Sequence, residues 1–133
     1  MRIHVDKKKC SGCRICEEIC SLKKVGGINP RKARIRIIRE GFSGVDQPVI
    51  CQQCKKPKCI PACPTGALTR DITYNTIKVD DGKCNMCGLC SEACPFGAIR
   101  IDPGTGKPLI CDLCNGDTNC VSWCPTQALS LLE

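Results

Sequence analysis

Sixteen cysteines in four runs of four constrain the fold of this 133-residue chain more than any other feature. Every run begins with a C-x2-C pair and ends with a C-x3-C pair, and the gap between the pairs holds 2, 4, 2 and 5 residues in turn. The runs are Cys10, Cys13, Cys16 and Cys20; Cys51, Cys54, Cys59 and Cys63; Cys84, Cys87, Cys90 and Cys94; and Cys111, Cys114, Cys120 and Cys124. No cysteine is left over, so the pattern indicates internal repetition of one kind of site.

The first and third runs have the spacing C-x2-C-x2-C-x3-C, which is typical of cubane iron-sulfur ligands. A short loop with this spacing can place three thiolates around one face of a cubane, and the fourth cysteine then points to a second cubane. Pro95 completes the signature in the third run, and the tails PTGAL, PFGAI and PTQAL follow the last three runs. Ser21 stands in place of that proline after the first run. We predict that each run supplies three ligands locally and one at a distance.

Zinc and disulfide bonds are the alternative uses of so many cysteines. Zinc sites usually use two cysteine pairs, whereas each run here adds a third and a fourth cysteine at C-x3-C spacing. Residues 1–10 contain no apolar signal region and no twin-arginine motif, so we expect a cytoplasmic chain unless a partner exports it. No stretch approaches the ~20 apolar residues of a membrane-spanning helix, so direct membrane insertion is not expected. Iron-sulfur clusters are therefore the favoured hypothesis.

The formal charge of +7 counts every cysteine as neutral. Four [4Fe-4S] clusters on sixteen thiolates would bring the net charge to about −1. The basic excess lies in residues 1–40, which hold 12 Lys or Arg and 4 Asp or Glu. The basic segment 31–39 has no interleaved aromatic residue, so we expect a solvated or partner-facing strand and no nucleic-acid binding.

Without the cysteines, roughly 40 apolar residues remain, which is few for a conventional core. We expect an α+β, ferredoxin-like architecture with short elements around the clusters. Strands are predicted over 2–6 and 33–39, and hairpins over 67–80 and 98–110, the second turning at 103–106. Helical turns are predicted around 17–20, 57–62, 91–94 and 118–124.

The whole chain resembles the four-cluster electron-transfer subunits of dimethyl-sulfoxide-reductase iron-sulfur subunit type, through all four runs in order. SGVDQPVICQQC and GTGKPLICDLCNGDTNCVSWCPTQAL are most similar to the small subunits associated with tungsten-containing aldehyde oxidoreductases. In many relatives the last run has a much longer middle gap. The resemblance implies a duplicated bacterial-ferredoxin-like fold over 1–133 with four [4Fe-4S] clusters. An inner module, 45–102, would lie between segments 1–44 and 103–133, which form the outer module.

Spacing alone does not fix how the runs pair, because 20 residues separate Cys63 from Cys84 and 16 separate Cys94 from Cys111. The resemblance implies that the first run pairs with the fourth and the second with the third. Its ligand sets are Cys10, Cys13, Cys16 and Cys124 for cluster 1; Cys20, Cys111, Cys114 and Cys120 for cluster 2; Cys51, Cys54, Cys59 and Cys94 for cluster 3; and Cys63, Cys84, Cys87 and Cys90 for cluster 4.

Nothing in the sequence provides for catalysis. His4 is the only histidine, no Gly-rich dinucleotide motif is present, and no cysteine is free to act as a nucleophile. We predict an electron-transfer subunit that carries low-potential electrons. The resemblance implies as partner the catalytic subunit of a tungsten or molybdenum oxidoreductase, or a carbon monoxide dehydrogenase or hydrogenase. A ferredoxin, a flavoprotein or further copies of the chain would be the other partner. A free soluble polyferredoxin and an iron-sulfur nucleic-acid-binding module are the rival hypotheses.

Two further features have two interpretations each. Lys55, Lys56 and Lys58 fill the widened gap of the second run, where they either dock an acidic partner or balance the charge of a cluster. Trp123 precedes Cys124, and we expect its ring to shield a cluster and pack the last run rather than to relay electrons.

Overall fold

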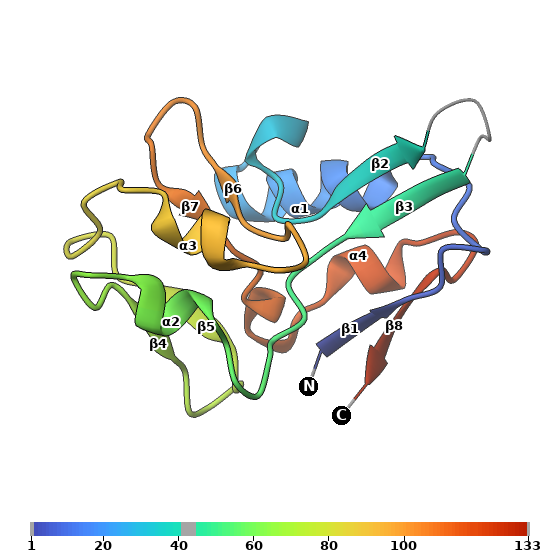
Figure 1. Ribbon diagram of the computed structural model, residues 1–133. Coiled ribbons are helices and arrows are strands. Elements are labelled where there is room, and N and C mark those ends of the chain that lie inside the picture. Colours follow the sequence, from blue (N-terminus) through green and yellow to red (C-terminus); the bar gives the residue numbers. More distant parts are fainter. Residues whose placement is uncertain (1, 41–44, 133) are drawn as a thin grey trace.

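The computed structural model describes residues 2–40 and 45–132, which form short strands and helical turns (Figure 1). The first two residues of the stretch SGVDQPVICQQC, at 43 and 44, lie outside the described residues. In chain order the elements are β1 (Arg2–Val5), α1 (Ile15–Val25), η1 (Pro30–Lys32), β2 (Arg36–Glu40), β3 (Val45–Val49), α2 (Cys59–Ala62), β4 (Leu68–Arg70), β5 (Ile77–Val79), α3 (Leu89–Ala93), β6 (Arg100–Ile101), β7 (Pro108–Leu109), η3 (Leu113–Gly116), α4 (Asn119–Ser122) and β8 (Leu129–Leu132). This α+β arrangement is ferredoxin-like.

The strands form four antiparallel two-stranded sheets. β1 pairs with β8, so that Arg2 lies opposite Leu132, and the two ends of the described chain lie side by side (Figure 1). The β4–β5 and β6–β7 pairs confirm the two predicted hairpins. Gly106, in the turn of the second hairpin, has the positive φ of +72° that favours glycine.

The strand predicted over 33–39 begins later, at Arg36, and pairs with β3, which was not predicted. Pro48 lies within β3, and proline lacks the N–H that a central strand needs. In a two-stranded sheet both strands are edges, so the missing donor is tolerated.

Helix α1 is much longer than the helical turn predicted around 17–20. Acidic residues lie in its first turn and lysines in its last turn, and these charges stabilise the helix through favourable interactions with its dipole. Gly26 ends the helix with φ +75°, and its N–H donates to the Leu22 carbonyl. Cys16 and Cys20 are four residues apart and both buried, so this helix holds two cysteines on its inner face.

Buried aliphatic residues and buried cysteines share one core. The largest fully buried aliphatic side chains are those of Ile3, Ile35, Ile50, Ile77 and Leu113, which come from strands and loops along the whole chain. Six cysteines, Cys16, Cys20, Cys51, Cys59, Cys90 and Cys111, are buried among them. The interior is therefore built around the cysteine loops, as the composition predicted.

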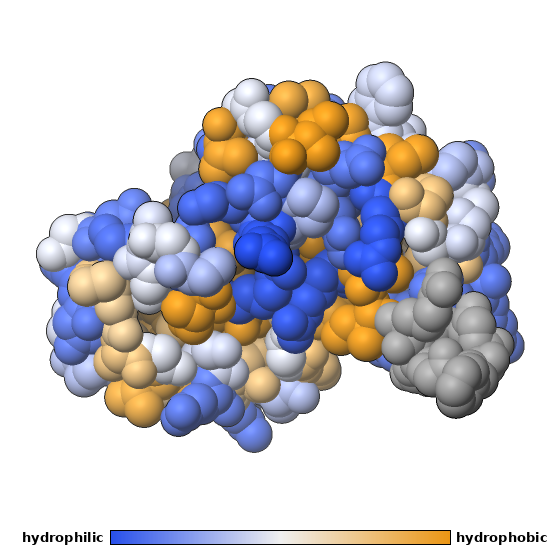
Figure 2. Space-filling model, turned by 90° about the horizontal axis from the view of Figure 1, so that it is seen from above, coloured by the Kyte–Doolittle hydropathy of each residue, from blue (hydrophilic) through white to orange (hydrophobic). Residues whose placement is uncertain are grey.

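Arginine side chains connect the N-terminal third to the segment after the third run. Arg36 Nη2 donates to the Gly97 carbonyl at 2.6 Å, and Arg100 Nη2 donates to the Pro30 and Ala33 carbonyls at 2.7 Å. Figure 2 views the molecule from above and shows hydrophilic residues over the middle of that face, between hydrophobic areas. The expectation of a solvated or partner-facing basic strand does not hold for Arg36, because its guanidinium donates an internal hydrogen bond to Gly97.

Within the described residues, none of the helices has the length and apolar character needed to cross a membrane.

Candidate iron-sulfur cluster sites

Three cavities are each lined by four cysteines. The first spans about 380 Å³, including open solvent at its mouth, and its thiols are Cys20, Cys111, Cys114 and Cys120. The second spans about 330 Å³ by the same measure, and its thiols are Cys63, Cys84, Cys87 and Cys90. The third spans about 310 Å³, and its thiols are Cys10, Cys13, Cys16 and Cys124. In each cavity three cysteines come from one run and the fourth comes from another run.

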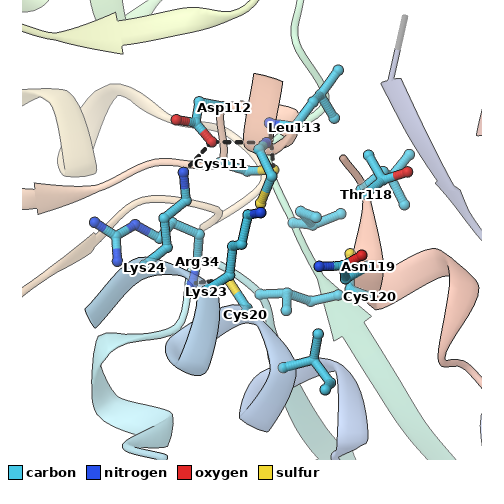
Figure 3. Close-up of a pocket in the computed structure, with 15 residues that line it drawn as sticks. Cys20, Lys23, Lys24, Arg34, Cys111, Asp112, Leu113, Thr118, Asn119 and Cys120 are labelled. Carbon is cyan, nitrogen blue, oxygen red and sulfur yellow. Dashed lines mark hydrogen bonds and ion pairs between the residues drawn. The ribbon is translucent and has the colours of Figure 1, made fainter. Parts of the chain in front are cut away.

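Figure 3 shows how distant segments meet around the first cavity. Cys20 projects from α1 on one side, while Cys111 and Cys120 lie on other sides of the same space. At the rim, Lys24 of α1 forms an ion pair with Asp112. This pair fixes the helix to the loop of the fourth run, so the cysteines of the two segments are held across the cavity from one another.

The remaining four cysteines, from the second run and the end of the third, also lie close together. The pKa of Cys51 is raised to about 11, mainly by burial; a hydrogen bond from the Gln53 backbone opposes the rise, and negative charge on Cys59, Cys54 and Cys94 adds to it. The pKa of Cys59 is also raised, mainly by burial and to a smaller extent by negative charge on the same neighbours, Cys94 and Cys54. The structure therefore places three of the predicted sets around one cavity each and places Cys51 within electrostatic range of Cys54, Cys59 and Cys94.

The loop between the first two cysteines has a left-handed residue at the same position in all four runs. The residue just before the second cysteine has a positive φ in each case: +74° at Gly12, +48° at Gln53, +62° at Met86 and +56° at Leu113. A non-glycine residue is uncommon in this region and needs support from its surroundings. Four different sequences therefore share one backbone feature at the second cysteine, although the fourth run continues into the 3-10 turn η3.

Backbone amides point at several cysteine sulfurs. Arg34 N–H donates to Cys20 Sγ at 3.2 Å, and Ala67 N–H donates to Cys63 Sγ at 3.3 Å. Gln53 and Leu113 donate to Cys51 and Cys111 at 3.4 Å. Such donors stabilise negative charge on a thiolate and tune the reduction potential of a bound cluster.

Burial keeps several thiols neutral in the absence of metal. It raises the pKa of Cys16 and that of Cys120 to about 12 and raises the pKa of Cys111 well above its usual value. A thiol becomes a thiolate when it coordinates a metal, because the positive metal centre compensates the cost of burying the charge. These cavities therefore fit a ligand that carries several positive iron centres.

Two threonines that sequence analysis missed contact cysteine sulfurs. The hydroxyl of Thr65 lies 3.5 Å from Cys63 Sγ, and this hydrogen bond is the main cause that lowers the pKa of Cys63 to about 7. Thr126 lies 3.8 Å from Cys124 Sγ. Although burial opposes it, hydrogen bonds from Leu129, Thr126 and Ala128 lower the pKa of Cys124. Both threonines follow the sequence Cys-Pro, a repeated signal that could have identified them.

Other sequence predictions have mixed outcomes. Trp123 is 61% exposed, so the expectation that it packs the last run was wrong; it follows α4, and its neighbour Cys124 lines the cavity instead. His4 is exposed on β1. Lys55, Lys56 and Lys58 are all exposed.

The fold and the cysteine sites define an iron-sulfur electron-transfer protein. Residues 45–133 match the 4Fe-4S dicluster domain family, and the chain belongs to this family.

Among similar proteins, the polyferredoxin-like subunit of the aliphatic sulfonate oxidoreductase of Pyrococcus furiosus is 45% identical over 122 residues, which cover 92% of this chain and 70% of that protein. The beta subunit of the NADH-dependent phenylglyoxylate dehydrogenase of Aromatoleum evansii is 40% identical over 129 residues, covering 96% of this chain and 29% of the relative. Against this second relative the chain therefore spans less than a third of the length.

The thiosulfate reductase electron transfer subunit PhsB of Salmonella typhi is 33% identical over 138 residues, covering 93% of this chain and 71% of that protein. A solved structure of the active site complex BamBC of benzoyl coenzyme A reductase, as isolated, aligns with a TM-score of 0.58 and 30% identity, over 96% of this chain and 74% of that chain. The present chain is accordingly an electron-transfer subunit and not a catalytic one.

Proposed function

We propose that this chain carries electrons through four [4Fe-4S] clusters between the catalytic subunit of an oxidoreductase and a second carrier. The observation that carries the proposal is the gathering of the sixteen cysteines into four sets, each drawn from two runs. We assign these sets as the ligands of clusters 1 to 4. A bound [4Fe-4S] cluster supplies one-electron redox chemistry at a potential set by its surroundings.

Electrostatic interactions between cysteines of different sets support the order 1–2–3–4 for the clusters. Negative charge on Cys120, of the cluster 2 set, raises the pKa of Cys16 in the cluster 1 set. Cys51 and Cys111 interact in the same way between clusters 3 and 2, and Cys59 and Cys90 between clusters 3 and 4. Ligands of adjacent sets are thus close enough for electrons to tunnel along the chain, over steps on the order of 10 Å in a domain of this size.

The residues of the chain would bind the clusters, shield them from water and tune their reduction potentials. The cysteine thiolates would hold the iron, and the aliphatic core would shield the buried sites. The N–H groups of Arg34, Gln53, Ala67 and Leu113, which donate to cysteine sulfurs, would stabilise negative charge there.

We propose that two ferredoxin-like modules build this arrangement. The pairing of β1 with β8 and the packing of α1 on α4 support an outer module of 1–44 and 103–133. The packing of α2 on α3 and the β4–β5 hairpin support an inner module of 45–102.

The names of the relatives support a partner of the oxidoreductase type, because several are subunits of such enzymes. Within that class we propose the catalytic subunit of a tungsten or molybdenum enzyme, acting in the cytoplasm, with a carbon monoxide dehydrogenase or hydrogenase as the second candidate.

The iron content of single and double cysteine variants tests the ligand sets. Anaerobic holoprotein should contain about 16 iron atoms per chain, and Cys13→Ala and Cys124→Ala should each lose about four. Since both residues are assigned to cluster 1, the double variant should lose no more than either single variant. The matched control, Cys13→Ala with Cys120→Ala, should lose about eight. A loss of about eight from the first pair would overturn the assignment.

Co-purification tests the partner. A stoichiometric large subunit that contains tungsten or molybdenum would support the proposal, and a brown protein that purifies alone from its native source would favour a free polyferredoxin.

A further inference from the structure

Two of the sixteen cysteines, Cys13 and Cys87, are exposed, and the others are buried or half-buried. In the proposed order, which this inference takes from the proposed function, Cys13 belongs to cluster 1 and Cys87 to cluster 4. The two exposed ligands therefore lie at the two ends of the series. Electrons that enter or leave the chain have their shortest path at these two points.

The surfaces around the two exposed cysteines differ in charge. Segment 84–91 around Cys87 carries no charged residue, and its Met86 and Leu89 are 56% and 42% exposed. The turn that leads into Cys84 holds exposed Asp80, Asp81 and Lys83, so its charges are of both signs. On the other side, a turn of three exposed lysines, Lys7 to Lys9, leads into Cys10. The Cys10 N–H donates to the Lys7 carbonyl at 3.4 Å, which fixes this turn beside the cavity that Cys10 and Cys13 share.

The three lysines are available for an external partner. Among the ion pairs within residues 2–40 and 45–132, none involves Lys7, Lys8 or Lys9. The half-exposed guanidinium of Arg14 adds positive charge next to Cys13, although it pairs with Glu17. We call Lys7, Lys8, Lys9 and Arg14 the lysine face.

We propose that the lysine face docks an acidic one-electron carrier protein, which exchanges electrons with the chain through cluster 1. Carboxylates on the carrier would meet the lysines, and complementary charge speeds association and orients the two proteins. One electron leaves the reduced carrier and reduces the chain, or the reverse. No bond is made or broken, and no other reactant is needed.

Lysines near a cysteine set could simply neutralise the charge of a cluster and dock no partner. A second group of lysines provides a control for this alternative. Lys55, Lys56 and Lys58 are equally exposed, but their neighbours Cys54 and Cys59 are half-buried and buried. They adjoin the set for the interior cluster 3. If the lysine face is the docking site, its removal should slow electron exchange, whereas removal of the second lysine group should not.

Stopped-flow mixing of anaerobic full-length holoprotein with a reduced acidic two-cluster ferredoxin tests the proposal. We expect the second-order rate constant of the wild type to fall steeply as salt is raised. The variant Lys7→Ala/Lys8→Ala/Lys9→Ala should react about tenfold more slowly at low salt and lose most of the salt dependence. The control Lys55→Ala/Lys56→Ala/Lys58→Ala should stay within about twofold of the wild type.

An unchanged rate in the first variant, or an equal loss in both, would overturn the docking proposal. A third outcome would also overturn it: the first variant no longer binds anionic lipid vesicles but reacts with ferredoxin at an unchanged rate. The lysine face would then contact a membrane surface. Reduction of the chain by dithionite, measured before mixing, tests the electron-transfer function separately from the docking proposal. A chain that dithionite cannot reduce contradicts the proposed function and the docking with it, whereas a fully reducible chain with unchanged kinetics contradicts the docking alone.

Discussion

The side-chain amide of Gln53 donates a hydrogen bond of 2.6 Å to the backbone carbonyl of Cys111, 58 residues further along the chain. The other end of the same amide accepts a hydrogen bond of 2.9 Å from the backbone N–H of Ile77. Gln53 is 7% exposed, so both bonds are made in the interior. One side chain thus connects the loop of the second run to the start of the fourth, where Cys51 and Cys111 approach one another.

Replacing Gln53 with leucine should loosen this connection. The change leaves the Cys111 carbonyl and the Ile77 N–H buried without partners, and each such group costs about 1–3 kcal/mol. We expect a loss of about 2–4 kcal/mol, measured as a lower guanidinium midpoint for the anaerobic loss of cluster absorbance. Gln52→Leu is the control, because Gln52 is half-buried and bonds only to the nearby Ile50 carbonyl. Equal midpoints for the two variants would contradict the linking role of Gln53.

Replacing Thr65 or Thr126 with valine should lower the reduction potentials of clusters 4 and 1, respectively. Each change removes a hydroxyl that stabilises negative charge on a ligand sulfur, so the reduced cluster becomes less favourable. We expect shifts on the order of tens of millivolts, measured by protein-film voltammetry. Thr69→Val, at an exposed position of β4, should leave all potentials unchanged. A rise in potential in either test variant would refute this role.

Gly12→Ala should destabilise the cluster 1 site. A methyl group at Gly12 would lie 2.2 Å from Asp46 Oδ2, and the backbone there has φ +74°. Gly66→Ala is a matched control, because Gly66 has φ +68° but no atom within 4 Å of the added carbon. The control should cost about 1–2 kcal/mol from backbone strain alone. We expect the Gly12 variant to lose more than this and to bind less iron; retention of full iron content would count against the contact.

Glu17→Ala should weaken the attachment of α1 to β2. The Glu17 carboxylate is 3% exposed and accepts a hydrogen bond of 2.5 Å from the Ile37 N–H. Its removal leaves that N–H buried and unpaired, which should cost about 2 kcal/mol in denaturant unfolding. Glu17→Gln keeps an acceptor and should lose less. Glu18→Ala, on the exposed side of the same helical turn, should change stability by about 0.5 kcal/mol or less.

The cysteine runs made the kind of site predictable, because ligand spacing in sequence reflects the geometry of a small loop. The hairpins were equally predictable from their alternation and turn residues. The length of α1 was missed because the cysteine pattern, rather than the helical period of its other residues, guided the prediction. Gln53 could not have been found, since its role depends on a buried amide that meets two segments far away in sequence. The identity of a partner depends on surfaces outside this chain.

The pairing of β1 with β8 has a consequence for biogenesis. Strand β1 is synthesised long before β8, so the sheet that they share cannot form until synthesis has passed Leu132. The cysteines of the second and third runs, by contrast, are already present when the chain has reached Cys94. Iron-sulfur assembly factors would therefore meet a nascent chain in which the proposed inner sites can be loaded first. The proposed cluster 1 site, which combines Cys10, Cys13 and Cys16 with Cys124, would be completed only later.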